Sequence, residues 1–196
     1  IIRGQIELVD ASDARDTEAT KAIVLEEIDR MSRLVSDLLV LAKTDRQDFL
    51  RLAPAHVPGV VQSVLNRVRP LAERDWHIQI ETPLDEPALL DEQRIVQALI
   101  QLVDNAIKHT SPGDLIELGA QRNDGLIEFW VRDSGAGVDE AHKALIFERF
   151  AQADKAADGF GLGLTIVSAI AVAHGGQLSL DQQASRAKGA TFRFSI

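Results

Sequence analysis

The sequence predicts an α+β fold, a two-layer sandwich with helices on one face of a mixed, mostly antiparallel sheet, preceded by part of a helical hairpin. Two observations lead to this prediction. From residue 57 onward, the apolar residues alternate between a helical and a strand-like period. Before residue 45 only the helical period is present, and Thr17–Lys43 contains neither Gly nor Pro. We therefore expect two domains, 1–46 and 47–196.

The N-terminal domain is predicted to hold one long helix over 17–43. Its apolar residues recur in alternating steps of four and three, the spacing of a helix in a coiled-coil-like bundle; they are Val24, Ile28, Met31, Val35, Leu38 and Ala42. Asp13, Asp16 and Thr17 are candidate caps at its start. Ile1–Val9 has the character of the last turns of another helix. The domain is thus expected to be a hairpin whose first helix is mostly missing.

The C-terminal domain follows a connection at 45–58, marked by Asp45, Asp48, Pro54 and Pro58. Two strands flank Asn123-Asp124-Gly125, a strong hairpin signal. The periodicity predicts helices at 57–73, 92–108, 139–147 and 162–173, and strands at 76–81, 115–120, 126–132, 177–180 and 190–196.

Composition excludes several classes of function. The formal net charge of -9 argues against nucleic acid as a partner, because phosphate backbones require a basic surface. The absence of cysteine excludes disulfides, thiolate zinc sites and cysteine nucleophiles. No apolar run is long enough to span a bilayer. We expect a cytoplasmic location, with any membrane contact made through segments outside this chain.

The predicted helix 92–108 carries polar residues opposite its apolar side. Gln101, Asn105 and Lys108 follow one another at steps of four and three, so their side chains project from one face. An amide oxygen suits a hard cation such as Mg²⁺, and a lysine provides a charge for phosphate. Taken alone, this pattern is better explained by an ordinary solvated helix face.

A second segment, Asp133-Ser-Gly135-Ala-Gly137, directly follows the predicted strand 126–132. A carboxylate at a strand end can accept a hydrogen bond from an exocyclic amine such as that of adenine. The two glycines allow a sharp turn and a close approach to a flat ligand. By itself, the segment supports no more than a plain strand-to-helix turn.

A third segment, Gly159-Phe-Gly161-Leu-Gly163-Leu164, opens the predicted helix 162–173. Glycines before a helix expose backbone N–H groups, which together with the helix dipole favour an anion. The spacing is not that of a P-loop, and the small polar residues 151–158 before it argue against a dinucleotide fingerprint. That stretch instead has the composition of a flap, and its Lys155 could reach a phosphate.

In this order, the segments resemble the ATP-binding domain of sensor histidine kinases. Asn105–Lys108 is similar to the family's N box, Asp133–Gly137 to its first glycine box, Ile146–Phe150 to its F box and Gly159–Gly163 to its second glycine box, and the helix 17–45 resembles the second helix of the dimerisation domain. Gln101 departs from the family, which has an asparagine there. The flap is also short and poor in arginine.

The resemblance implies that Asn105 binds Mg²⁺, with Gln101 as a further candidate, and that Asp133 contacts the adenine amine. Lys108 and His109 are then expected near the phosphates, and Phe147 and Phe150 at the base of the flap. The full set of expected ATP-binding residues is Asn105, Lys108, His109, Asp133, Gly135, Gly137, Phe147, Phe150, Lys155, Gly159, Gly161, Leu162, Gly163 and Leu164.

The implied activity is transfer of the γ-phosphoryl group of ATP to a histidine, for relay to an aspartate of a response regulator. The family's H-E-L-R-T-P acceptor motif is absent, so we expect the acceptor upstream of Ile1 and no catalytic residue within this chain. Expected partners are a response regulator receiver domain and a second copy of the chain, with the parent protein an inner-membrane sensor. The alternatives are a serine kinase or ATPase of the same fold, and a non-catalytic docking module.

Overall fold

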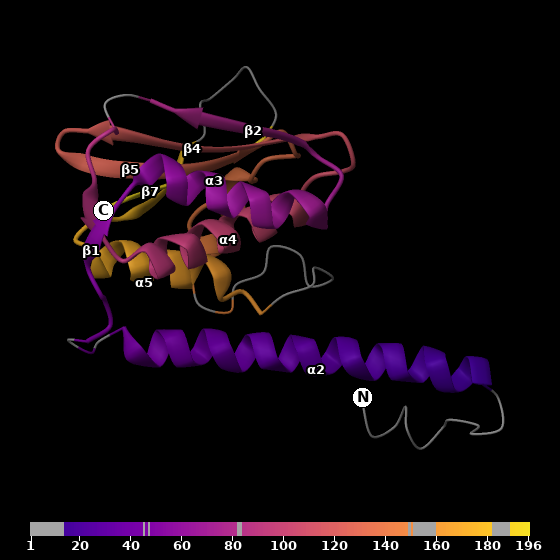
Figure 1. Cartoon of the computed structure of the whole chain (residues 1–196). Coiled ribbons are helices and arrows are strands. Elements are labelled where there is room, and N and C mark those ends of the chain that lie inside the picture. The colour runs from indigo at the N-terminus through magenta and orange to yellow at the C-terminus, as the bar shows by residue number, and fades with distance from the viewer. Residues whose placement is uncertain are drawn as a thin grey trace. The chain divides into compact units, whose positions relative to one another are not determined.

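The computed structural model describes residues 14–44, 46, 48–81, 84–148, 150, 160–181 and 189–196, without the side chains of residues 14–17 and 19. The chain divides into two compact units between Ala42 and Lys43. The helix expected at residues 1–9 lies outside the described residues. Figure 1 shows the long helix of the first unit and the layered second unit.

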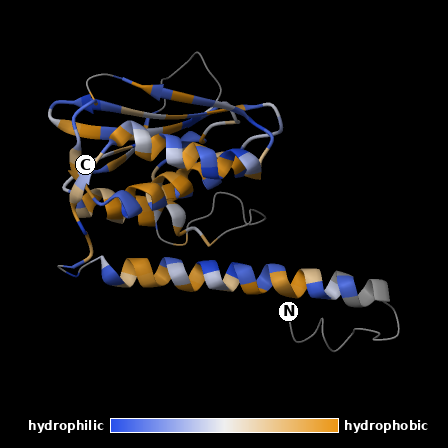
Figure 2. Cartoon of the chain, in the orientation of Figure 1, coloured by the Kyte–Doolittle hydropathy of each residue, from blue (hydrophilic) through white to orange (hydrophobic). Residues whose placement is uncertain are grey.

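The first unit contains helix α2 (Ala14–Lys43), which confirms the predicted 17–43 helix. The helix begins earlier than predicted, so Asp16 and Thr17 are part of it and the expectation that they cap it is wrong. Polar and apolar residues alternate along α2 (Figure 2). No helix in the described part of the chain is long and apolar enough to cross a membrane.

The second unit is built on a five-stranded sheet in the order β2-β4-β5-β7-β6. Only the β2–β4 pair is parallel, which confirms the mostly antiparallel sheet. Asp124 and Gly125 join β4 to β5 with φ values of 49° and 84°, as a two-residue hairpin turn requires. The strands are β2 (Asp75–Ile80), β4 (Leu115–Asn123), β5 (Leu126–Asp133), β6 (Leu178–Asp181) and β7 (Thr191–Ser195).

Three helices lie on one face of this sheet (Figure 1): α3 (Val57–Val68), α4 (Glu92–Lys108) and α5 (Gly163–Ala173). Helix α4 has the predicted bounds, and the Asp91 carboxylate caps it by accepting from the Arg94 N–H at 3.1 Å. Helix α5 is hydrophobic along nearly its whole length (Figure 2). The core between helices and sheet includes the fully buried Leu99, Leu102, Phe129, Ile166, Ile170 and Phe194.

Two short strands, β1 (Ala53–Ala55) and β3 (Ala88–Leu90), form an additional antiparallel pair that the sequence analysis did not predict. Pro58 lies in the first turn of α3 and not in the connection, because proline fits a helix start, where its missing N–H costs nothing. Helix α3 gives way to the 3₁₀ turn η1 (Arg69–Leu71), which contains Pro70, instead of continuing to residue 73.

The α-helix predicted at 139–147 is wrong. The segment forms two 3₁₀ turns, η2 (Glu140–His142) and η3 (Leu145–Phe147). The Asp139 carboxylate accepts from the Ala141 N–H at 2.9 Å, which stabilises a tight turn at the start. Neither turn buries a residue, so little packing favours a continuous helix over turns in this short segment.

Candidate functional site

Helix α4 presents a polar edge near its C-terminal end. Asn105 is half-buried, and its carboxamide makes no hydrogen bond with another residue that the structure describes. Lys108 is exposed, and its Nζ pairs with Asp104 Oδ2 at 2.6 Å. An exposed pair of this kind contributes at most about 1 kcal/mol, so it can be exchanged for a phosphate partner at small cost. Because the Asn105 carboxamide makes no hydrogen bond with another described residue, its oxygen is available as a ligand for a hard cation.

Asp133, the last residue of β5, is only 4% exposed. Its Oδ1 accepts from the Gly135 N–H at 2.9 Å and the Ala190 N–H at 3.4 Å. Within the described residues, no group donates to Oδ2. Burial raises the pKa of this carboxyl, while the two backbone donors and the charge of His109 oppose the rise. One carboxylate oxygen is therefore held by the protein and the other is available to a ligand.

The turn after Asp133 packs against the end of α4. A Cβ atom at Gly135 would lie 2.2 Å from the backbone oxygen of His109, so only glycine permits this approach. Gly137 adopts a φ of 79°, and a Cβ there would lie 2.9 Å from the Gly189 oxygen. Both glycines of the predicted first glycine box thus serve close contacts with the protein's own backbone, whereas the predicted approach to a flat ligand stays a prediction.

The start of α5 offers backbone N–H groups. Its N-cap, Leu162, makes no side-chain capping bond and is almost fully buried. Gly161, with a φ of 67°, precedes it, and Leu164 is half-buried in the first turn. A Cβ atom at Gly163 would lie 2.9 Å from Gln101 Oε1, which places the Gln101 amide at the first residue of α5. Such a helix start is suited to an anion.

The last residue of the predicted F box, Phe150, contacts the chain just before α5. The Phe150 N–H donates to the Gly161 oxygen at 3.1 Å, and Phe150 adopts a φ of 65°. Phe147 lies in η3, is half-buried, and belongs to an element that contacts α5. The hydrogen bond joins the two ends of the segment predicted as a flap. Lys155, Gly159 and the flap itself lie outside the described residues.

The structure thus brings the three predicted segments together through α4. Gln101 lies at the start of α5, and four residues further Asn105 projects from the same side of the helix. His109, the C-cap of α4, contacts Gly135 beside the buried Asp133. No group of three or more acidic or histidine side chains that could hold a metal occurs among the described residues.

Two residues of this site have no counterpart in the sequence predictions. Gly189 and Ala190 precede β7 and contact Asp133. A glycine immediately before the last predicted strand was the only available signal, and a single glycine there is typical of many turns.

The histidines outside the site have structural contacts. His56 accepts from the Gly59 N–H at the start of α3, and the exposed His77 pairs with Asp75 at 3.1 Å. The His174 Nε2 accepts from the Asp91 N–H at 3.1 Å, and its Nδ1 lies 2.8 Å from the Ile170 oxygen. In this pattern Nδ1 is the donor and Nε2 the acceptor. His174 therefore joins the end of α5 to the start of α4, whereas His56 caps α3 and His77 pairs within β2.

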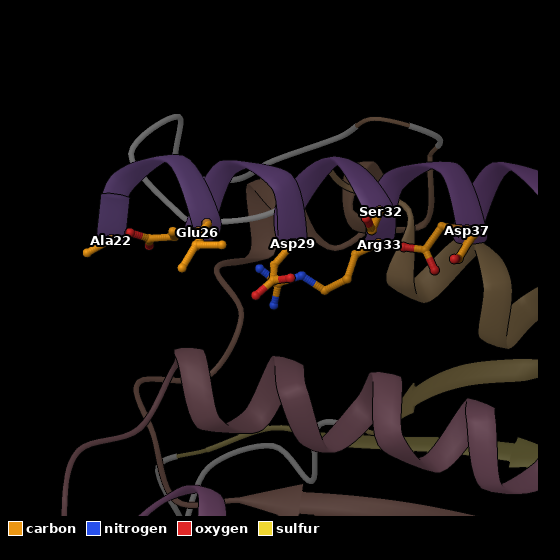
Figure 3. Close-up of a pocket in the computed structure, with 8 residues that line it drawn as sticks. Ala22, Glu26, Asp29, Ser32, Arg33 and Asp37 are labelled. Carbon is orange, nitrogen blue, oxygen red and sulfur yellow. The ribbon is translucent and has the colours of Figure 1, made fainter. Parts of the chain in front are cut away.

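A shallow hollow on the surface of α2 has no part in this site. It is lined by Ala22, Leu25, Glu26, Asp29, Ser32, Arg33, Ser36 and Asp37, all from one helix. Figure 3 draws these side chains along α2. None of them belongs to the predicted nucleotide-binding set, and a single helix face offers no enclosing wall.

Comparison with known proteins identifies the family and relatives of this chain. The family model described as histidine kinase-, DNA gyrase B-, and HSP90-like ATPase matches residues 90–196. The sensor histidine kinase YkoH of Bacillus subtilis is 36% identical over 185 residues, which cover 91% of this chain and 39% of YkoH. The sensor histidine kinase CusS of Escherichia coli O157:H7 is 30% identical, with 98% of this chain and 40% of CusS covered.

Among solved structures, full-length ShkA in complex with AMPPNP is similar with a TM-score of 0.76 and 32% identity. The likeness covers 94% of this chain and 39% of that chain. This chain therefore spans about two fifths of the length of these relatives.

Proposed function

Because the chain belongs to the family of histidine kinase-, DNA gyrase B- and HSP90-like ATPases, we propose that it binds Mg²⁺-ATP and donates the γ-phosphoryl group to a histidine. The acceptor histidine belongs to a helix upstream of Ile1, and an aspartate of a response regulator receives the group afterwards. The curated relatives named above are sensor histidine kinases, and the proposal extends their activity to this chain.

The observation that carries the proposal is the position of α4 between both glycine segments. Asp133 Oδ2 accepts from the adenine amine, since Oδ1 is already engaged by two backbone donors. Asn105 supplies an amide oxygen for Mg²⁺, and the first N–H groups of α5 receive phosphate oxygens. Lys108 and His109 supply positive charge and donors beside the phosphates, joined by Lys155.

Charge balance explains how an acidic chain can perform this task. With a net charge of -9, it cannot attract phosphates over its whole surface. Bound Mg²⁺ neutralises phosphate charge, which is most of what phosphoryl transfer requires beyond positioning. The residues of this chain bind and orient the nucleotide, so a substrate histidine presented in line with the γ-phosphate completes the reaction.

The proposal also concerns helix α2 of the first unit. Ile28, Met31, Val35 and Leu38 are each 43–55% exposed and lie along one stripe. A stripe of this length on an isolated helix is stabilised by pairing in a bundle. We infer that a second copy of the chain packs against it, and that a response regulator binds the assembled bundle.

The direct test measures ATP binding to this chain by calorimetry, with Mg²⁺ and with a chelator. Asn105→Ala and Asp133→Ala are expected to weaken binding by about tenfold or more, because each removes a polar contact to the ligand. Asn66→Ala and Asp85→Ala, which change exposed residues of the same types elsewhere in the unit, serve as controls. Undiminished binding in both site variants would contradict the proposal.

A longer form that includes the upstream helix tests phosphoryl transfer. It is expected to become phosphorylated with Mg²⁺-ATP, and the product is expected to be acid-labile, as phosphohistidine is. An acid-stable product would favour a serine kinase of the same fold. Nucleotide binding without any transfer would favour the docking module.

A further inference from the structure

The residues just before β7 approach the end of β5 very closely. We call Gly189–Ala190 the strap. The Asp133 N–H donates to the Ala190 oxygen at 2.9 Å, and the Ala190 N–H donates to Asp133 Oδ1 at 3.4 Å. The strap therefore contacts both the backbone and the side chain of the same buried aspartate.

This approach depends on the absence of a side chain at residue 189. Gly189 adopts a φ of 121°, where L-residues are strained. A Cβ atom there would lie 1.9 Å from the Asp133 oxygen and 3.1 Å from the Ser134 Cα. These are backbone atoms, which cannot rotate away as the end of a flexible side chain can. Any substitution at Gly189 must therefore displace the strap, Asp133 or both.

A second glycine closes the arrangement from the other side. A Cβ atom at Gly137 would lie 2.9 Å from the Gly189 oxygen. Gly135 completes the set, because its N–H donates to Oδ1 and a Cβ there would lie 3.0 Å from the same oxygen. Gly135 and Gly189 thus lie against Asp133, Gly137 lies against Gly189, and two backbone donors converge on a single carboxylate oxygen.

We propose that the strap is a positioning element of the nucleotide site, which holds Asp133 Oδ1 so that Oδ2 alone faces the base and selects a 6-amino purine. The inference rests on the proposed function, since it assumes that Asp133 contacts the base. Gly189 and Ala190 touch the aspartate and not the nucleotide, so they are positioning residues.

The selectivity follows from hydrogen-bond chemistry. A 6-amino purine presents a donor to Oδ2, whereas a 6-oxo purine such as guanine presents an acceptor that the carboxylate repels. A buried carboxylate fixed by two donors cannot turn to relieve that repulsion, and rejection is strong where buried polar groups are left unpaired. If the strap moves, the carboxylate gains freedom and the preference between the two bases becomes smaller.

The test compares three variants of this chain, Gly189→Ala, Gly137→Ala and the control Gly125→Ala. Gly125 has a φ of 84°, close to the 79° of Gly137, yet a Cβ at Gly125 meets nothing within 4 Å. The control therefore carries a similar backbone strain without contact to the strap. Dissociation constants for Mg²⁺-ATP and Mg²⁺-GTP are measured for each folded protein, and the Asp133 titration is followed by NMR without nucleotide.

Gly189→Ala is expected to weaken ATP binding by about tenfold or more and to reduce the ATP-to-GTP affinity ratio by a similar factor. Loss of the Ala190 donor is expected to move the measured Asp133 pKa further upward, because that hydrogen bond favours the ionised form. Gly137→Ala should change the same quantities in the same direction by a smaller amount. Gly125→Ala should leave the ratio and the titration as in the wild type.

If Gly189 mattered for folding alone, Gly189→Ala would lower the thermal midpoint without changing the ATP-to-GTP affinity ratio. Unfolded molecules reduce the number of binding sites, but they do not change the preference of the sites that remain. If Gly189→Ala does not fold, Gly137→Ala decides the question. A wild-type ratio and a wild-type Asp133 titration in the folded variants would overturn the inference. Absence of ATP binding to the wild type would instead contradict the proposed function, and the NMR measurement would still test whether the strap holds Asp133.

Discussion

Helices α2 and α4 are both amphipathic, yet they differ in what covers their apolar sides. In α4 the stripe is closed off by its own unit: Ile95 and Leu99 are fully buried, and Leu102 is 1% exposed. In α2 the corresponding residues, such as Val35 and Leu38, remain about half exposed. The same periodicity therefore belongs to a buried apolar side in α4 and to a half-exposed apolar side in α2.

This difference determines what each helix can do. Since the apolar side of α4 is fixed against the sheet and α5, its polar edge is held in place, with Gln101 at the start of α5 and His109 at Gly135. A rigid element of this kind can position groups for chemistry. Among the described residues of its unit, the stripe on α2 has no comparable cover, so its function is expected to be association.

The largest expected effect contrasts Leu99→Ala in α4 with Leu38→Ala in α2. Leu99→Ala leaves a cavity in the core and should lower the free energy of unfolding by roughly 2–5 kcal/mol. Leu38→Ala should change the unfolding of the second unit by less than about 0.5 kcal/mol. Urea denaturation followed by the fluorescence of the buried Trp130 measures both. Similar losses of the free energy of unfolding in the two variants would contradict the difference in burial between α4 and α2.

The next prediction concerns association through α2. Val35→Glu places a charge in the middle of the stripe and should weaken self-association about 100-fold, because burying an unpaired charge is costly. Ser36→Glu, its neighbour on the polar side, is the matched control and should leave association unchanged. Light scattering over a range of concentrations measures both. Equal association of Val35→Glu and wild type would contradict a second copy on this stripe.

Most of the fold could be predicted from the sequence, because in a long segment the period of the apolar residues shows both the type of element and its buried face. Helices α4 and α5 and the β4–β5 hairpin were located to within a few residues. The β1–β3 pair was missed because three-residue strands have no measurable period. The two 3₁₀ turns were mistaken for a helix, since propensity in a short segment is decided by tertiary packing.

The site was predictable where a motif lies within one segment and not where segments meet. Asn105 and Asp133 could be nominated from their local patterns. The contact of Gln101 with the start of α5 joins residues about sixty positions apart, and no spacing rule reports it. The contribution of Ala190 is also invisible in the sequence, because its backbone N–H, which any residue but proline has, makes the contact.

A third prediction uses the pH dependence of Asp133, whose turn packs on the end of α4. Burial raises the pKa of this carboxyl in the folded state, so the folded protein binds the proton more tightly than the unfolded chain. Its contribution to stability is present below the unfolded pKa and is lost as pH rises through the folded pKa. Nucleotide affinity should depend on pH in the opposite way. It should fall as the pH is lowered, because protonation of Asp133 removes the acceptor for the adenine amine.

Asp133→Asn separates the two effects. Removing the buried charge should preserve or raise stability at neutral pH relative to wild type, while ATP affinity falls about tenfold or more, since an amide donor can face the adenine amine. Denaturation and calorimetry of both proteins between about pH 4 and pH 8 provide the measurement. Parallel pH profiles of ATP affinity in the two proteins would show that Asp133 does not contact the base.

The smallest expected effect lies where α4 meets α5. Gly163→Ala places a methyl group 2.9 Å from Gln101 Oε1, so the flexible amide must move away at a cost of about 0.5–1.5 kcal/mol. Gln101→Asn shortens the side chain by one methylene and should remove that conflict. The double variant is then expected to bind ATP more tightly than Gly163→Ala alone, with a coupling energy of about 0.5 kcal/mol or more. Calorimetry on the four proteins of this cycle measures the coupling, and strictly additive changes would mean that the amide does not rest on the start of α5 in solution.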